Sequence, residues 1–184
     1  LLDNGTSRQP KDRVFMDTIA AIAARRSIRR FTAEPVPEEA LRVILTAATQ
    51  APSGKNRQPW RFVVVRQDRR AELIRAMRAG LSRSREQGLD LGSSVGTTRI
   101  MEQAPVTVFV FAPDGKAPWE PHSTLEAVRD VVDIQSIGAA IQNMLLAAQE
   151  LGLGSLWICD VFYAYEELCA WLGEPGQMIA AVAF

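Results

Sequence analysis

Histidine and cysteine are scarce in this sequence. Its 184 residues include one histidine, His122, and two cysteines, Cys159 and Cys169. The spacing of the two cysteines fits neither a CxxC motif nor a zinc site, and two thiols make no disulfide framework. The histidine follows Pro121 in a loop, and the sequence contains no GxSxG or HExxH motif. These absences argue against serine-hydrolase and zinc chemistry, and the unpaired thiols indicate a reduced, cytoplasmic setting.

Net charge and long apolar runs are also lacking. Lys and Arg number 21, Asp and Glu number 21, and the formal net charge is zero. A chain without excess positive charge has no bulk attraction to nucleic acid or to an anionic membrane. No apolar run is long enough to predict a membrane span. The first residues show no charged segment leading into an apolar one, so we expect no secretory leader.

The length predicts one domain over residues 15–184, preceded by a flexible arm over residues 1–14. Alternating and helical spacings of apolar residues define the expected elements. Helices are expected at 15–26, 37–48, 68–79, 124–151 and 165–172, and strands at 61–66, 105–111, 155–158 and 178–184.

Residues 80–98 differ in composition from the segments around them, because Gly, Ser and Arg dominate there. Such a stretch is typical of a mobile segment, and long excursions are often functional. We therefore expect residues 80–103 to form a mobile lid over a site.

The expected helix over residues 124–151 is apolar around its whole circumference in its second half. A helix of this kind cannot face water in a chain of this size. Either the rest of the monomer or a second copy of the chain must cover it, and we favour the homodimer. Gln142 and Asn143 interrupt the apolar half and need hydrogen-bond partners, either in an internal turn or across a dimer interface.

A basic cluster follows the first expected helix and contains Arg25, Arg26, Ser27 and Arg29. Guanidinium groups bind phosphate oxygens in a bidentate manner, and a hydroxyl adds another donor. Arginines at the end of a helix also complement its dipole without binding anything. Taken alone, the cluster fits this second interpretation better.

Two further segments carry polar or small residues. The loop Ala51–Trp60 places Ser53, Asn56 and Gln58 where they could read the edge of a heteroaromatic ring, or could hydrogen-bond only within the loop. Residues 154–160 form a turn of small residues leading into a strand, which would let the backbone approach a planar ligand. They do not match the dinucleotide fingerprint, because Trp157 stands where its third glycine belongs. Cys159 is more typical of a packing residue than of a redox thiol.

Together, these motifs resemble the FMN-dependent nitroreductase family. The resemblance rests on Arg-Arg-Ser-Ile-Arg-x-Phe from Arg25, Ala-Pro-Ser-x-x-Asn-x-Gln-Pro-Trp from Ala51, and Ala-x-Gln-Asn-x-x-Leu from Ala140 followed by Gly-Leu-Gly-Ser-x-Trp-Ile from Gly152. It extends from about residue 15 to residue 184, and the order and spacing of all three motifs agree.

The resemblance implies an α+β fold with a mostly antiparallel central sheet flanked by helices. It also implies a homodimer with two active sites at its interface and one FMN in each. The family's cofactor contacts correspond to three groups of residues here. Arg25, Arg26, Ser27 and Arg29 would hold the phosphate and ribityl chain; Pro52, Ser53 and Asn56 would face the partner's isoalloxazine; the backbone of Ile158, Cys159 and Asp160 would lie near flavin N5, with Gln142 as an additional contact. Members of the family continue beyond the last strand with a tail that embraces the partner and supplies a basic residue to the phosphate, and this sequence shows no such tail after Phe184.

The activity implied is transfer of a hydride from NAD(P)H to flavin N5, followed by reduction of a nitroaromatic, quinone or similar acceptor in a ping-pong cycle. The flavin carries this chemistry, so no catalytic side chain is expected. Two alternatives remain open. One is a specialised flavoenzyme of the same fold, such as a flavin-degrading synthase, a reductive dehalogenase or a dehydrogenase. The other is a non-catalytic flavin-binding protein.

Overall fold

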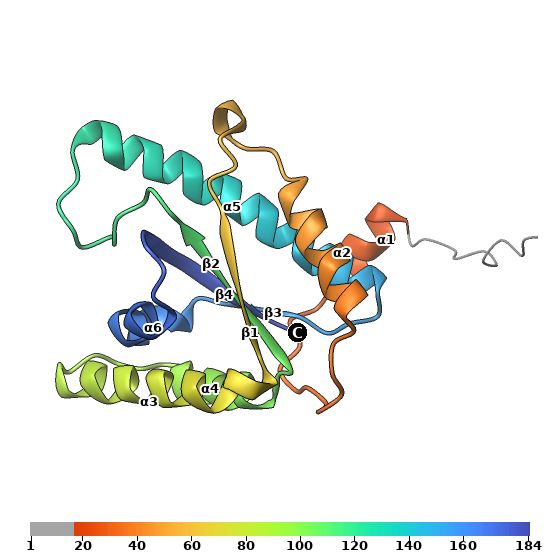
Figure 1. Ribbon diagram of the computed structural model, residues 1–184, viewed down its shortest axis with the longest axis horizontal. Coiled ribbons are helices and arrows are strands. Elements are labelled where there is room, and N and C mark those ends of the chain that lie inside the picture. The colour runs from red at the N-terminus through yellow and green to blue at the C-terminus, as the bar shows by residue number, and fades with distance from the viewer. Residues whose placement is uncertain (1–16) are drawn as a thin grey trace, which may run out of the picture.

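In the computed structural model, which describes residues 17–184, helices cover both faces of a four-stranded sheet (Figure 1). The strands, in their order across the sheet, are β1 (Arg61–Arg66), β2 (Val106–Ala112), β4 (Gln177–Ala183) and β3 (Leu156–Ile158). Each neighbouring pair is antiparallel. The mostly antiparallel α+β fold is therefore confirmed, whereas the arm expected at residues 1–14 lies outside the described residues.

The central strand β2 shows how the sequence divides the core into two layers. Successive side chains of a strand point to opposite faces of the sheet. Val108 and Val110 accordingly belong to the cluster on one face, and Phe109 and Phe111 to the cluster on the other. All four are completely buried, as a strand covered on both faces requires.

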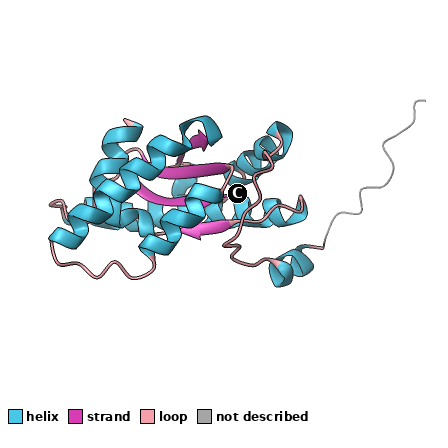
Figure 2. Ribbon diagram, turned by 90° about the horizontal axis from the view of Figure 1, so that it is seen from below, coloured by secondary structure: helices cyan, strands magenta, loops and turns pink. Residues whose placement is uncertain are grey.

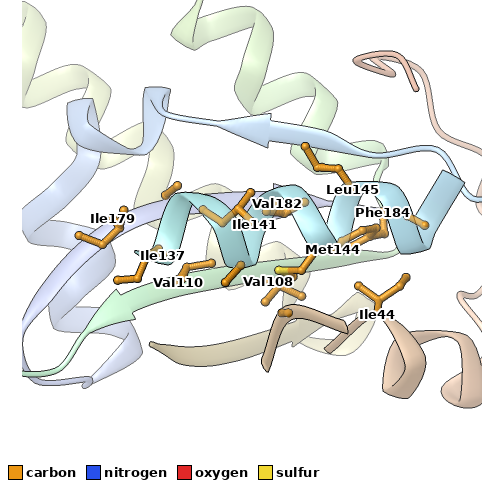
Figure 3. Close-up of a cluster of buried hydrophobic side chains, with 14 of the residues drawn as sticks. Ile44, Val108, Val110, Ile137, Ile141, Met144, Leu145, Ile179, Val182 and Phe184 are labelled. Atoms are coloured by element: carbon orange, nitrogen blue, oxygen red, sulfur yellow. The ribbon is translucent and has the colours of Figure 1, made fainter. Parts of the chain in front are cut away.

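Helices α2 (Glu38–Thr49) and α5 (Thr124–Glu150) cover the first face (Figures 1 and 3). Ile137, Ile141 and Met144 of α5 are fully buried against the sheet, together with Ile44 of α2. By length and composition alone α5 could cross a membrane. Its packing against β2 and β4 makes it the core helix of this layer.

The second face is covered by α3 (Arg70–Glu86), α4 (Ser94–Gln103) and α6 (Tyr165–Leu172), as the two perpendicular views show (Figures 1 and 2). Leu73, Met77, Met101 and Leu168 carry the buried contacts of these helices. Short 3₁₀ segments η1 (Gly54–Asn56), η2 (Gln67–Arg69) and η3 (Asp160–Ala164) connect several of the elements.

The start of α5 is fixed by a capping box. The Ser123 hydroxyl accepts a hydrogen bond from the Glu126 backbone N–H, and the Glu126 carboxylate accepts one from the Ser123 N–H. Lys116 forms an ion pair with the same carboxylate. These hydrogen bonds, first to Lys116 and then to Ser123, lower the pKa of Glu126 to about 2, so the capping carboxylate is ionised near neutral pH.

The segment at residues 80–103 differs from the expectation in its secondary structure. The helix expected to end at residue 79 continues to Glu86, and a further helix, α4, occupies residues 94–103. Gly80 lies within α3, where a Cβ atom would stand 2.3 Å from the Cα of Ala164. This glycine therefore permits close packing of α3 against η3. Movement of the segment as a lid stays a prediction.

The first described helix, α1 (Thr18–Ala24), is capped by Asp17, whose carboxylate accepts a hydrogen bond from the Ile19 N–H. The helix ends slightly before the expected residue 26, so that Arg25 and Arg26 belong to the extended segment that follows it. Arg25 remains the C-terminal capping residue of α1, whereas Ser27 and Arg29 lie beyond the helix.

Candidate active site

A cleft of about 620 Å³ opens between α4 and the turn that follows β3. It is lined by Arg29, Gly92, Ser93, Gly96, Thr97, Ile100, Leu156, Trp157, Ile158, Cys159 and Asp160. Four of the residues singled out from the sequence therefore share one cavity: Arg29, Ile158, Cys159 and Asp160.

The basic cluster reaches the cleft because its backbone pairs with the segment before β3. Ser27 forms a parallel bridge with Ser155, and the Ile28 N–H donates a 2.9 Å hydrogen bond to the Ser155 carbonyl. Gly154 lies so close to Ile28 that a Cβ atom would stand 3.0 Å from that side chain. Two motifs more than a hundred residues apart are thus brought side by side.

The arginines of the basic cluster are available to bind an anion. Arg29 is exposed and donates one weak hydrogen bond, 3.3 Å long, to the Ser27 carbonyl. Across residues 17–184, no ion pair involves Arg25, Arg26 or Arg29. A guanidinium carries five N–H donors, so most of the donors of Arg29 are free for an anion. Arg25, Arg26 and Ser27 precede Arg29 in the sequence but do not line the cleft.

Asp160 connects the two walls of the cleft. Its carboxylate accepts a 2.9 Å hydrogen bond from the Ser93 hydroxyl and a short one from the Thr97 hydroxyl. Ser93 precedes α4 as its N-terminal capping residue and Thr97 lies one turn further along, so the carboxylate is near the end of the helix at which the dipole favours a negative charge. The side chain of Asp160 thus holds α4, and its neighbour Cys159 is an exposed residue whose partly desolvated sulfur lies at the cleft.

The Cys159 thiol is not activated. Burial of the sulfur and the nearby Asp160 carboxylate raise the pKa of Cys159 above its ordinary value. Low thiol pKa values belong to cysteines stabilised by a neighbouring positive charge, whereas the charged group that acts on Cys159 is the Asp160 carboxylate. The raised pKa argues against a redox thiol, but the packing role expected from the sequence does not fit an exposed residue that lines the cleft.

The loop carrying Pro52, Ser53 and Asn56 does not line the cleft of its own chain. It sits above the middle of α5 at the start of β1 (Figure 1). Within it, the Ser53 hydroxyl accepts a hydrogen bond from the Gln58 N–H, and the Asn56 amide oxygen accepts one from the Gln58 side chain. A contact between this loop and a flavin held by a second subunit stays a prediction.

The two adjacent amides of α5, Gln142 and Asn143, have different surroundings. Asn143 donates a 3.0 Å hydrogen bond to the Ala47 carbonyl and so ties α5 to α2. Gln142 is half-buried and does not line the cleft, so its assignment as a cofactor contact also stays a prediction.

Several residues of the cleft had not been identified from the sequence: Gly92, Ser93, Gly96, Thr97 and Ile100. All lie in the segment expected to cover a site, and its Gly and Ser content was the available signal. Among the described residues no group of His, Cys, Asp and Glu could hold a metal ion. His122 instead lies 3.0 Å from Asp130, outside the cleft.

The family model named Nitroreductase matches residues 22–184, which include both walls of the cleft. The chain belongs to the nitroreductase family. This membership confirms the resemblance carried by the three motifs. The antiparallel sheet flanked by helices agrees with the fold of a solved nitroreductase-family structure.

Three relatives illustrate the match. A protein of Methanothermobacter thermautotrophicus, assigned as an NADH dehydrogenase/NAD(P)H nitroreductase, is 34% identical over 77% of this chain and 60% of its own length. A crystal structure of a protein assigned as a nitroreductase from Desulfovibrio desulfuricans, in complex with FMN, is 34% identical with a TM-score of 0.67, covering 90% of this chain and 83% of the other. A nitroreductase with bound FMN from Desulfitobacterium hafniense is 28% identical with a TM-score of 0.69, covering 91% and 88%.

The nitroreductase domain described above spans about three fifths of the length of the first of these relatives. What the comparisons establish for this chain is its family and its fold.

Proposed function

We propose that this nitroreductase-family chain binds FMN in the cleft beside Arg29 and uses NAD(P)H to reduce nitroaromatic, quinone or similar acceptors. The observation that carries the proposal is the meeting of Arg29 with residues 158–160 in one cavity. Relatives of this chain that contain FMN, and one named for NAD(P)H, support the choice of cofactor and reductant.

The residues present fit a flavin phosphate and a flat ring. The cleft volume falls within the range of roughly 300–1,000 Å³ that is typical of sites for small ligands. Arg29 offers uncompensated guanidinium donors for a phosphate, with Arg25, Arg26 and Ser27 next to it. At Gly92 and Gly96 there is open space where a side chain would stand, so the α4 wall leaves room for a planar group.

Bound FMN would supply the redox chemistry, accepting a hydride at N5 and passing reducing equivalents to the acceptor. The chain's own residues bind and orient. The arginines hold the phosphate electrostatically, the backbone at Ile158, Cys159 and Asp160 sets the position of the ring, and the Asp160 contacts to Ser93 and Thr97 hold the α4 wall. No side chain is assigned a proton transfer.

A homodimer with the cofactor at its interface is part of the proposal. The first half of α5 exposes Leu125, Val128 and Val131 with relative accessibilities of 80%, 57% and 55%, and Ile19 of α1 is 72% exposed. Leu125, Val128 and Val131 follow one another at helical spacing, and an exposed apolar stripe of this kind is typical of an interaction surface. Helix α1 lies beside the other end of α5 (Figure 1). A second copy covering them would bring the loop carrying Ser53 and Asn56 to its partner's cleft. The unpaired cysteines fit a cytoplasmic location for such a dimer.

Steady-state kinetics test the reaction. With NADH or NADPH and a quinone as varied substrates, double-reciprocal plots should give parallel lines, because each substrate uses the same open face of the flavin in turn. Protein that binds FMN tightly but lets neither nicotinamide reduce it would contradict the reductase assignment. That result would favour a specialised or non-catalytic flavoprotein instead.

A further inference from the structure

A buried carboxylate lies beneath the loop that carries Ser53 and Asn56. Asp133 belongs to α5, its side chain is 4% exposed, and one of its oxygens lies 3.3 Å from Nη2 of Arg57 in the loop. The other oxygen, Oδ1, has no hydrogen-bond partner among the described residues. Removing a carboxylate from water is unfavourable unless a partner compensates, so Arg57 is the principal compensation for this charge.

Two more contacts join the loop to the same face of α5. The Gly54 N–H donates a 3.3 Å hydrogen bond to the Ser136 hydroxyl, which itself donates to the Val132 carbonyl. A Cβ atom at Gly54 would stand 2.4 Å from a methyl carbon of Val132. Val132, Asp133 and Ser136 lie within one helical turn of each other. The loop is therefore attached by a close approach, a hydrogen bond and an ion pair.

The loop needs this attachment because its backbone is unfavourable. Lys55, Asn56 and Gln58 have φ values of 54°, 54° and 50°, in the left-handed region that residues with side chains rarely adopt. Conformations of this kind persist where surrounding contacts determine them, and they concentrate at functional sites. Asn56, one of the residues expected to face a flavin, is among the three.

We propose that Asp133 is a positioning residue for the FMN site, acting through Arg57 to hold Ser53 and Asn56 in the conformation that contacts the flavin of the partner subunit. This inference rests on the proposed function, because only a flavin bound between subunits gives the loop a ligand. Asp133 touches no part of the cleft, so its influence passes through the loop.

Arg57 lies near two carboxylates, and the pair that it forms with Asp133 matters more for the loop than the pair with Asp114. Arg57 also lies 3.8 Å from Asp114, whose side chain is 76% exposed. Arg129, Asp130 and Asp114 complete the charged groups acting on Asp133, and His122 pairs with Asp130. Because solvent screens the exposed Asp114, the loop depends on Asp133 far more than on Asp114.

The test compares Asp133→Asn with the matched control Asp114→Asn by titrating each FMN-free protein with FMN. Asp133→Asn keeps the side-chain shape and removes the charge. We expect its FMN affinity, measured by quenching of flavin fluorescence, to fall at least tenfold, and the visible circular dichroism of the bound flavin to change. Asp114→Asn should alter the affinity less than twofold and leave the dichroism as in the wild type. Faster amide exchange confined to residues 53–58 of the FMN-free variant should accompany the loss.

The outcomes separate the two levels of the proposal. Wild-type protein that binds no FMN would overturn both the proposed function and the positioning role. FMN binding that is tight in the wild type and unchanged in Asp133→Asn, with unchanged dichroism, would overturn the positioning role alone. Ser136→Ala, which removes the hydroxyl that accepts from Gly54, is the second variant. If Asp133→Asn does not fold, at least a threefold loss of affinity in Ser136→Ala supports the attachment, and an unchanged affinity rejects it.

Discussion

The Thr97 hydroxyl donates a hydrogen bond to the Asp160 carboxylate, and this contact joins α4 to the turn after β3. Thr97 is buried, whereas the second donor to the same carboxylate, Ser93, is exposed. Helix α4, which belongs to the segment expected to move, is therefore hydrogen-bonded to residues 158–160, which are expected to lie along the flavin. Movement of α4 away from this turn would require these bonds to break.

Replacing Thr97 by valine should loosen α4 selectively. The substitution keeps the shape of the side chain and removes its hydroxyl, with an expected cost of about 1.5 kcal/mol, at the low end for a hydrogen bond to a charged group. Hydrogen exchange of the α4 amides should accelerate about tenfold. The control is Ser82→Ala, which removes a hydroxyl that bonds to Glu86 on the surface of α3. Equal protection of α4 in Thr97→Val and wild type would contradict a fastening role.

Replacing Arg29 by alanine should weaken FMN binding by about 1.5–3 kcal/mol, which is the contribution of one hydrogen bond to a charged group. The matched control is Arg30→Ala. Arg30 is the next residue along the chain but lines a different hollow, beside Pro35 and Phe184. Fluorescence titration with FMN measures both variants. If both lose affinity equally, the effect is general attraction by the basic cluster and Arg29 holds no phosphate.

The Cys159 thiol should react slowly with Ellman's reagent at pH 7 although it is exposed. Its pKa is raised, so the thiolate fraction at neutral pH is below that of a free cysteine, and the rate should keep increasing above pH 9. The experiment uses the Cys169→Ser background, because burial raises the pKa of Cys169 to about 11 and the two signals must be separated. Rapid reaction at pH 7 would indicate an activated thiol and reject this account.

Gly54→Ala should destabilise the protein, since the new methyl group would meet Val132 at 2.4 Å. Overpacking of this kind costs about 1–3 kcal/mol, and Val132 cannot rotate away freely because branched side chains are stiff in helices. Val132→Ala in the same chain should restore most of the loss. Denaturant unfolding of both variants gives the comparison, and a double variant no more stable than Gly54→Ala would show that the contact is not the cause.

Most strands and helices could be predicted because their patterns record burial directly. Val108 and Val110 alternate with Phe109 and Phe111, which fixes β2 as a strand covered on both faces. The largely apolar helix beginning at Thr124 was equally clear. Gly80 was misleading because glycine signals both flexibility and close packing, and only the position of Ala164 decides between them.

The site was predictable in its parts and less so in its assembly. Arg29 and residues 158–160 could be associated through a family resemblance, and the cleft brings them together. The contribution of Ser93 and Thr97 depends on the path of α4, which no local pattern fixes. Asp133 would be interpreted from sequence as a solvated helix residue, because its burial under Arg57 is a tertiary contact. The loop at Ser53 remains a prediction for a second subunit.

The central claim is that FMN in this cleft accepts electrons from NAD(P)H. Its most direct measurement is the visible absorption spectrum of the purified, FMN-loaded protein, recorded without oxygen before and after addition of NADH or NADPH. We predict a flavin absorption band that is present at the start, bleaches with the nicotinamide and returns when a quinone is added. A protein that stays colourless after incubation with FMN, or a flavin band unaffected by either nicotinamide, would contradict the account.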